Sequence, residues 1–149
     1  MGQVGRYYYP DDVWIDISDP GHVWIKKIED SRVKMGIDDF AAKNMEEIIS
    51  IRTQKKGKEL EKGKFFATVE SGKWTGPLII PLSGKIVEIN PEISENPSIA
   101  NEDPYDRGWL VIFEAKNLEE ELNNDPNLVK GSEVEKLEKW IEVEEEKYL

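Results

Sequence analysis

Short apolar runs, each ended by a turn, occupy the chain from residue 13 to residue 113. The turns contain glycine, proline or clusters of polar residues, which interrupt regular structure. The runs are long enough for strands but too short for stable helices. The predicted strands are residues 13–17, 22–28, 32–37, 48–51, 65–70, 78–80, 85–89 and 109–113. This spacing predicts an all-β barrel or sandwich and argues against a fold of alternating strands and helices.

Two helix starts interrupt the predicted strands. Asp38 or Asp39 can cap a short helix over residues 40–45, because a carboxylate accepts a hydrogen bond from the first free backbone amides. Asn90 can cap a second helix that begins at Pro91, where proline is favoured. We therefore expect a mainly β fold with flanking helices.

The composition changes after residue 116. The segment 117–149 holds eleven acidic residues and four lysines, a net charge of -7 out of -11 for the whole chain. It reads as two helices separated at Asp125-Pro126, with near capping-box patterns at Asn117 and at Ser132. We expect residues 1–20 to be an extension packed on the domain, 21–116 to be the core, and 117–149 to be an acidic helical segment.

The second of these helices has one apolar face. That face holds Val134, Leu137, Ile141 and Tyr148, with Trp140 at its edge. The simplest interpretation is that it covers the barrel. Docking of a partner protein on this face is the alternative.

The residue inventory excludes most side-chain chemistry. The chain has no cysteine and a single histidine, His22. Disulfides, thiolate catalysis, cysteine-ligated metal sites and histidine metal clusters are therefore excluded. No acid–base pair or nucleophile constellation stands out either. If the protein takes part in transfer or redox reactions, its reactive group must be brought in from outside.

Net charge and hydropathy indicate which kinds of macromolecule or membrane the chain can bind. A net charge of -11 disfavours nucleic acid, because phosphates would be repelled, and favours docking on basic protein surfaces. No run approaches the roughly 20 apolar residues that cross a bilayer, so we expect no membrane association. The first residues lack an apolar signal region. We expect a cytoplasmic monomer.

A lysine lies at the centre of the most suggestive segment. Lys73 follows the turn dipeptide Ser71-Gly72, between the strand-like run 65–69 and the apolar run 77–82. This pattern predicts a β-hairpin with Lys73 at or beside its tip. Such a lysine stands away from the core and suits a side chain that is modified and swung between sites. A solubilising loop lysine is the plainer alternative.

Three stretches together resemble the glycine cleavage system H proteins. The first is His-Val-Trp at 22–24 with Gly-Ile-Asp-Asp-Phe-Ala at 36–41. The second is Glu-Ser-Gly-Lys at 70–73, followed by Pro-Leu-Ser-Gly at 81–84 and a strand ending in Asn90. The third contains Asn-Pro at 96–97, Asn101, Pro-Tyr at 104–105 and Gly-Trp at 108–109. The resemblance covers about residues 20–115, and its order and spacing are more specific than any one stretch.

The resemblance implies a lipoyl-domain-like flattened β-barrel, a barrel-sandwich hybrid, that carries lipoate covalently on Lys73. It makes the protein a non-catalytic carrier that shuttles an aminomethyl group and reducing equivalents. The implied partners are a lipoate ligase or lipoyl transferase, glycine decarboxylase, aminomethyl transferase and dihydrolipoyl dehydrogenase. Glu70, Ser71 and Gly72 would complete the segment that the ligase reads, with Glu70 as an orienting charge or simply a strand-end carboxylate. Trp74 would pack over the arm or close the end of the barrel.

Several positions depart from the family pattern around this tip. Trp74 replaces a small alanine, Gly72 replaces valine, and Met-Glu-Glu-Ile at 45–48 replaces Leu-Gly-Asp-Ile. These changes leave the carrier interpretation intact and open the question of the partner. One alternative is an H-protein-like lipoate-binding protein that carries sulfur intermediates for sulfur-oxidising enzymes of the heterodisulfide-reductase type. Another is an unmodified protein-binding domain.

Overall fold

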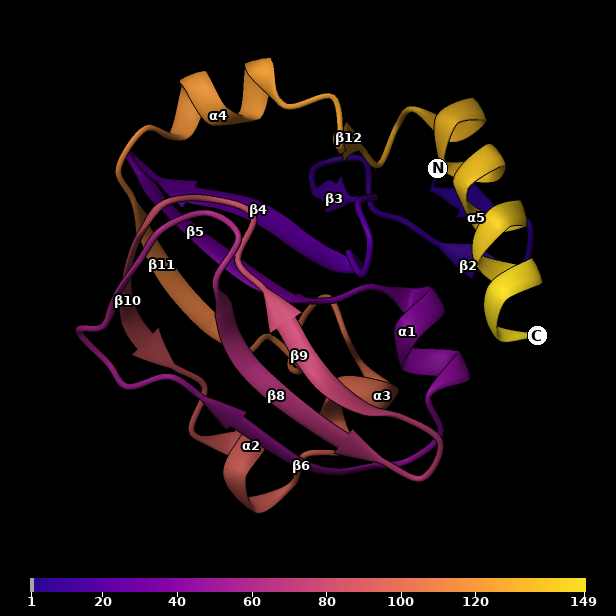
Figure 1. The fold of residues 1–149 in the computed structure, drawn as a ribbon, viewed down its shortest axis with the longest axis horizontal. Helices are drawn as coiled ribbons and strands as arrows, with labels where there is room; N and C mark the ends of the chain where they lie inside the picture. The colour runs from indigo at the N-terminus through magenta and orange to yellow at the C-terminus, as the bar shows by residue number, and fades with distance from the viewer. Residues whose placement is uncertain (1) are drawn as a thin grey trace.

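The computed structural model describes residues 2–149, and two β-sheets form its body (Figure 1). The larger sheet has seven strands in the order β12-β3-β4-β5-β11-β10-β7, and the smaller has the order β6-β8-β9. The larger sheet contains β3 (Trp14–Asp16), β4 (Val23–Glu29), β5 (Arg32–Ile37), β7 (Glu59–Leu60), β10 (Gly84–Ile89), β11 (Val111–Ala115) and β12 (Leu128–Lys130). The smaller contains β6 (Ile48–Thr53), β8 (Phe65–Ser71) and β9 (Thr75–Ile79). A separate hairpin joins β1 (Gln3–Val4) and β2 (Tyr7–Tyr8).

The main core contains side chains from both sheets. In β5, Val33, Met35 and Ile37 alternate along the strand and are fully buried. Val69 of β8 is equally buried in the same cluster. Alternation with one face inward is the pattern of a sheet packed on one side, so the mainly β expectation is confirmed.

A second core lies against the first, under the C-terminal helix. Its buried members come from the N-terminal segment, the larger sheet, the first helix and the last helix: Val4, Tyr7, Tyr9, Val13, Ile15, Trp24, Phe40, Val129, Leu137, Trp140 and Ile141. The apolar face predicted for residues 134–148 is therefore turned inward. Trp140 is buried with that face and Tyr148 remains partly exposed.

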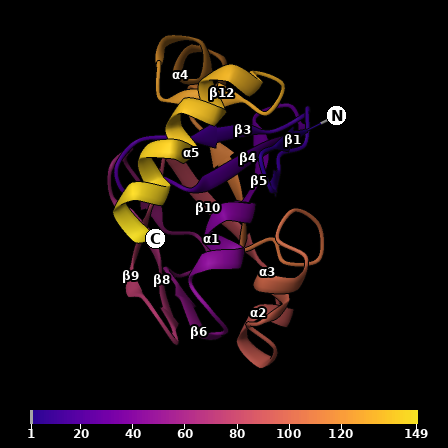
Figure 2. The same cartoon turned by 90° about the vertical axis from the view of Figure 1, so that its right-hand side faces the viewer.

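Within residues 2–149, five helices lie around the sheets. They are α1 (Asp39–Asn44), α2 (Glu92–Glu95), α3 (Ile99–Glu102), α4 (Leu118–Asn124) and α5 (Val134–Tyr148). Asp38 caps α1, since its side chain accepts a hydrogen bond from the Ala41 amide. Helix α5 lies beside α1 at one edge of the molecule (Figures 1 and 2).

The helix starts in the tail differ from the prediction. Helix α5 has Glu133 and not Ser132 as its N-cap residue, and the cap residue Asn117 of α4 makes no side-chain cap hydrogen bond. The Glu133 carboxylate instead accepts a hydrogen bond from the Lys130 amide, which closes the turn before α5. At the second predicted start, Pro91 is the cap residue of α2 and the Asn90 side chain accepts from the Glu92 amide.

The tail also contains a strand that the sequence pattern did not reveal. Strand β12 lies between the two helices and pairs with β3 at the edge of the larger sheet, with Val129 opposite Ile15. Three residues are too few to show an alternating pattern, so this strand is recognisable only from its partner. Within residues 2–149, no helix is long and apolar enough to cross a membrane.

Candidate functional site

Lys73 lies in the loop that connects β8 to β9, and it is exposed. Ser71 closes this loop from the end of β8. Its backbone amide donates to the Trp74 carbonyl at 2.8 Å, and its hydroxyl donates to the same oxygen at 2.9 Å. The hydroxyl also accepts from the Trp74 amide at 3.0 Å. These bonds cross the hairpin on either side of Lys73, so its backbone is held while its side chain is free to extend.

The hairpin stands on a well-paired strand. Strand β8 is the middle strand of the smaller sheet, with Val69 opposite Ile51 of β6 and Gly76 of β9. Val69 and Phe66 are completely buried. A lysine at this position therefore projects from a stiff support.

The neighbours of Lys73 differ in their contacts. Glu70 is exposed, and its carboxylate lies 3.5 Å from the Ser50 hydroxyl. Gly72 is also exposed, and its amide donates to the Glu47 carbonyl at 3.2 Å. The Trp74 ring is half-buried and folds back so far that a Cβ on Gly76 would lie 2.7 Å from it. Trp74 packs on the main core and also lines the cavity beside Lys73.

An apolar cavity of about 120 Å³ opens beside the lysine. Its walls come from the hairpin, from α1 and its approach, and from the end of α5. They include Lys73, Trp74 and Leu78 from the hairpin, Phe40 and Met45 from the α1 region, and Tyr148 from α5. An apolar cavity of roughly 150 Å³ accepts a benzene ring. This space therefore suits a small apolar ring attached to a chain.

Two neighbours of this site were not found from the sequence. Glu46, between α1 and β6, has a left-handed φ of 63°, and its carboxylate lies 2.8 Å from where a Cβ on Gly72 would be. The signal for Glu46 was its replacement of the family's glycine, since glycine adopts positive φ without strain. Tyr148 was assigned to the helix face alone, because its approach to the tip depends on how α5 docks.

Residues of the first and third family-like stretches stabilise the backbone around the hairpin tip. The Asn101 side chain accepts from the Ile48 amide at 2.8 Å and donates to the carbonyls of Ala42 and Glu46 at 2.9 and 2.8 Å. It therefore fixes the turn from α1 into β6, which carries Glu46 to the hairpin. All three of these bonds are to backbone groups, which is a structural use of the side chain.

The aromatic motif residues have separate roles. Trp24 is fully buried and donates from its ring nitrogen to the Pro104 carbonyl at 2.9 Å. Trp109 is half-buried and packs against the second core, with the Lys34 ammonium 5.2 Å from its ring centre.

His22 is buried just before β4, with both ring nitrogens engaged. Its Nδ1 lies 3.0 Å from an Asp38 oxygen, and its Nε2 lies 2.6 Å from a Glu144 oxygen. These contacts give His22 a structural role in which both ring nitrogens have partners. Among residues 2–149, no group of three or more His, Cys, Asp or Glu side chains is placed to hold a metal ion.

Two stacked sheets with a lysine exposed at a hairpin tip have the arrangement of a lipoyl-domain-like carrier. A family model of the glycine cleavage H-protein matches residues 17–141. The glycine cleavage system H protein 2 of Aquifex aeolicus is 40% identical over 137 residues, covering 91% of this chain and 82% of that protein. A probable glycine cleavage system H protein 2 of Sulfurisphaera tokodaii is 38% identical over 120 residues, 80% of this chain and 81% of that protein.

A solved structure is also similar. The crystal structure of a glycine cleavage system H protein from Mycobacterium marinum superimposes with a TM-score of 0.69 at 27% identity, over 84% of this chain and 94% of that one. The chain belongs to the glycine cleavage H-protein family, whose members are non-catalytic lipoyl carriers of the glycine cleavage system. The flattened barrel-sandwich fold is thereby confirmed, and the glycine cleavage role is favoured over the sulfur-carrier alternative.

Proposed function

We propose that Lys73 carries lipoate as an amide on its side-chain nitrogen, and that this arm shuttles an aminomethyl group and reducing equivalents. The observation that carries the proposal is the exposed lysine at a closed hairpin tip with an apolar cavity beside it. When attached, lipoate supplies a dithiolane that accepts an aminomethyl group together with two electrons. The residues present fit this group, because the cavity wall is apolar and sized for a small ring.

The protein's own residues position the arm and shelter it. The Ser71 hydrogen bonds hold the tip in one shape, so the Lys73 amine is presented to a modifying enzyme in a constant frame. Trp74, Phe40 and Leu78 offer an apolar surface against which the distal end of the arm can rest. A chain without cysteine has no internal thiol that would exchange with the dithiolane.

Tethering explains why a carrier with no catalytic groups is useful. A group on a long arm meets successive partner enzymes at a high effective concentration. The partners we propose are a lipoate ligase or lipoyl transferase for loading, followed by glycine decarboxylase, aminomethyl transferase and dihydrolipoyl dehydrogenase. The net charge of -11 favours encounter with basic surfaces on such partners.

The test is reconstitution with purified partners. The chain is incubated with a lipoate ligase and then assayed with glycine decarboxylase for exchange of the glycine carboxyl group with bicarbonate. We expect exchange that depends on lipoylation and is abolished in Lys73→Arg, which keeps the charge but cannot form the amide. Lys64→Arg, an exposed lysine at the opposite end of β8, is the matched control and should retain exchange.

Two outcomes would overturn the proposal. A lipoylated protein that supports no exchange with any glycine cleavage partner would point to sulfur intermediates as the cargo. A protein that takes no lipoyl group, and is unmodified when isolated from its host, would point to a binding domain instead.

A further inference from the structure

The end of α5 is part of the wall beside Lys73. Tyr148 lines the same cavity as Lys73 and Trp74, and its ring centre lies 6.5 Å from that of Phe40, another wall residue. The family match ends at residue 141, so the last turns of α5 lie beyond the matched region.

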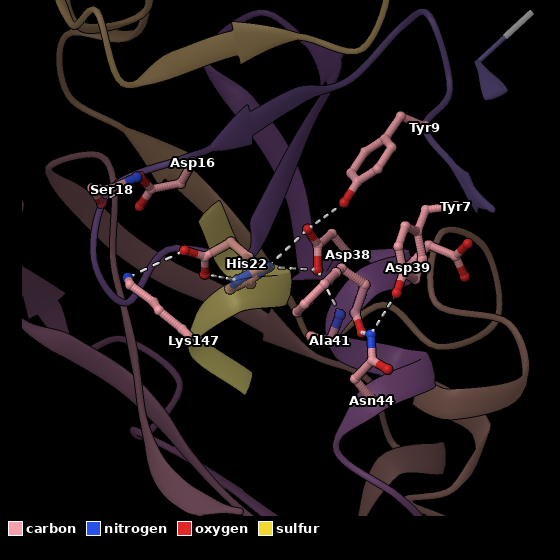
Figure 3. A network of polar contacts seen from close by, with 12 residues as sticks. Tyr7, Tyr9, Asp16, Ser18, His22, Asp38, Asp39, Ala41, Asn44 and Lys147 are labelled. Carbon is pink, nitrogen blue, oxygen red and sulfur yellow. Dashed lines mark hydrogen bonds and ion pairs between the residues drawn. The ribbon is translucent and has the colours of Figure 1, made fainter. Parts of the chain in front are cut away.

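A buried ionic contact joins these last turns to His22, and Figure 3 labels His22, Asp38 and Lys147 of the network around it. Glu144 lies one turn before Tyr148, and it is only 2% exposed. Its carboxylate is 2.6 Å from Nε2 of His22, whose Nδ1 is 3.0 Å from Asp38, the cap of α1. His22 thus connects α5 to α1, and His22 itself lines the cavity together with Phe40 of α1 and Tyr148 of α5.

The contacts match a His22 ring that is protonated on both nitrogens. Ionised carboxylates accept hydrogen bonds and cannot donate them, whereas a neutral imidazole donates from only one nitrogen. With Asp38 on one nitrogen and Glu144 on the other, both nitrogens donate. The ring is also sandwiched, with centres 5.1 Å from Phe40 and 4.6 Å from Trp140.

The surrounding charges agree with this state. Burial alone would lower the pKa of His22, but Asp38 and Glu144 outweigh it and raise that pKa from 6.5 to about 9. Burial opposes ionisation of Glu144 as well, yet the hydrogen bonds from His22 and Lys147 hold its pKa below its usual range. Lys147 lies 3.2 Å from Glu144 and 3.5 Å from Asp19, and Tyr9 donates to Asp38 at 2.8 Å.

We propose that the last turns of α5 form a movable wall of the arm's resting site, and that the His22–Glu144 contact holds this wall closed. The inference rests on the proposed function of Lys73. It adds that the position of α5 controls how readily the lipoyl arm leaves the cavity. Tyr148 supplies the contact surface. Glu144 is a positioning residue that acts through α5 and does not touch the arm.

Two variants test the His22–Glu144 contact and the apolar wall at Tyr148 separately. Glu144→Gln keeps the size of the side chain and removes its charge. Tyr148→Ala removes the apolar wall and leaves the contact intact, and because Tyr148 is 41% exposed this variant should fold. Glu146→Gln, an exposed residue on the same helix, is the matched control.

The first measurement is amide hydrogen exchange over residues 142–149 in the unmodified protein. Because the charge of Glu144 is lost and its hydrogen bond with His22 is weakened, we expect exchange there to rise about tenfold in Glu144→Gln. The NMR titration of His22, the chain's one histidine, should show a lower pKa in this variant. Neither readout should change in Glu146→Gln, and Tyr148→Ala should leave the His22 titration unchanged.

The second measurement is the rate at which a water-soluble phosphine reduces the dithiolane of the lipoylated protein. We expect several-fold faster reduction in Glu144→Gln and in Tyr148→Ala, and the wild-type rate in Glu146→Gln. If Lys73 is lipoylated and reduction is equally fast in all four proteins, the wall has no role and the carrier function stands. If no lipoyl adduct forms on the chain, both proposals are overturned.

Discussion

At the scale of single residues, the tip depends on one hydroxyl and tolerates one unfavourable backbone angle. Ser71 is buried, and its hydroxyl bonds to the backbone of Trp74. Ser71 therefore determines the shape of the hairpin tip beside Lys73, in addition to any part it has in recognition by the lipoate ligase. Glu46 adopts a left-handed conformation that costs a residue with a side chain of order 1 kcal/mol relative to glycine. The sequence predicted the exposed lysine and the turn before it. It did not predict that the Ser71 hydroxyl is buried and bonds to the backbone, because burial of a turn hydroxyl depends on the neighbouring strands.

Ser71→Ala should loosen the tip more than it destabilises the fold. The substitution removes two hydrogen bonds and leaves the Trp74 amide without its side-chain acceptor, which should lower the free energy of unfolding by about 1 kcal/mol. We expect faster amide exchange at residues 72–74 and slower lipoylation. Ser94→Ala, which removes one exposed hydroxyl from α2, should change neither. Unaltered exchange at the tip in Ser71→Ala would contradict this role.

Glu46→Gly should stabilise the protein or leave it unchanged. Relief of the left-handed strain gains up to about 1 kcal/mol, and the greater freedom of glycine in the unfolded chain offsets part of this. Urea unfolding measures the sum. A loss of more than about 1 kcal/mol would mean that the Glu46 side chain makes a stabilising contact over Gly72 that outweighs the strain.

At the scale of elements, the motif residues bring β4, β5 and the loop after α3 together. Trp24 of β4 lies directly opposite Gly36 of β5, and a Cβ on Gly36 would be only 2.8 Å from the indole nitrogen. That nitrogen is held by Pro104 at 2.9 Å, so the ring cannot move aside freely. The strands of the main sheets were predictable because their apolar runs are long. The pairs β1–β2 and β12–β3 could not be predicted from the sequence. Strands β1 and β2 have only two residues each, and β12 pairs with a strand that is distant in the sequence.

Gly36→Ala should therefore cost about 1–3 kcal/mol by overpacking. Thermal or urea unfolding gives the loss. In a Trp24→Phe background the same substitution should cost less, because the smaller ring leaves room for the methyl group. Equal costs in the two backgrounds would show that the ring is not what excludes a side chain at position 36, since contacting residues are expected to be non-additive.

At the scale of the whole molecule, His22 links the C-terminal helix to the first helix and, through the C-terminal helix, to the N-terminal hairpin. It precedes β4, bonds to the cap of α1 and bonds to α5, which packs on the N-terminal hairpin. No pattern in the sequence placed Glu144 beside His22, because the two residues are 122 positions apart. The apolar face of α5 was predictable from its spacing, whereas the buried carboxylate on that face was hidden among eleven acidic residues in the tail.

Stability should decline in mildly alkaline solution. The pKa of His22 is raised from 6.5 to about 9 on folding, so its contribution is complete below pH 6.5 and is lost as the pH rises through about 9. The shift corresponds to about 3 kcal/mol. Urea unfolding across this range should show the decline in the wild-type protein and a smaller one in Glu144→Gln. A wild-type free energy of unfolding that stays level from pH 6.5 to 9 would contradict the charged state of His22.

The most direct test of the whole account is to map the modification. The chain is treated with a lipoate ligase, and intact mass and peptide mass spectrometry locate the adduct. The account predicts one lipoyl group per chain on Lys73, absent in Lys73→Arg and retained in Lys64→Arg. A lipoyl group on any other lysine, or none on the wild-type chain, would contradict it.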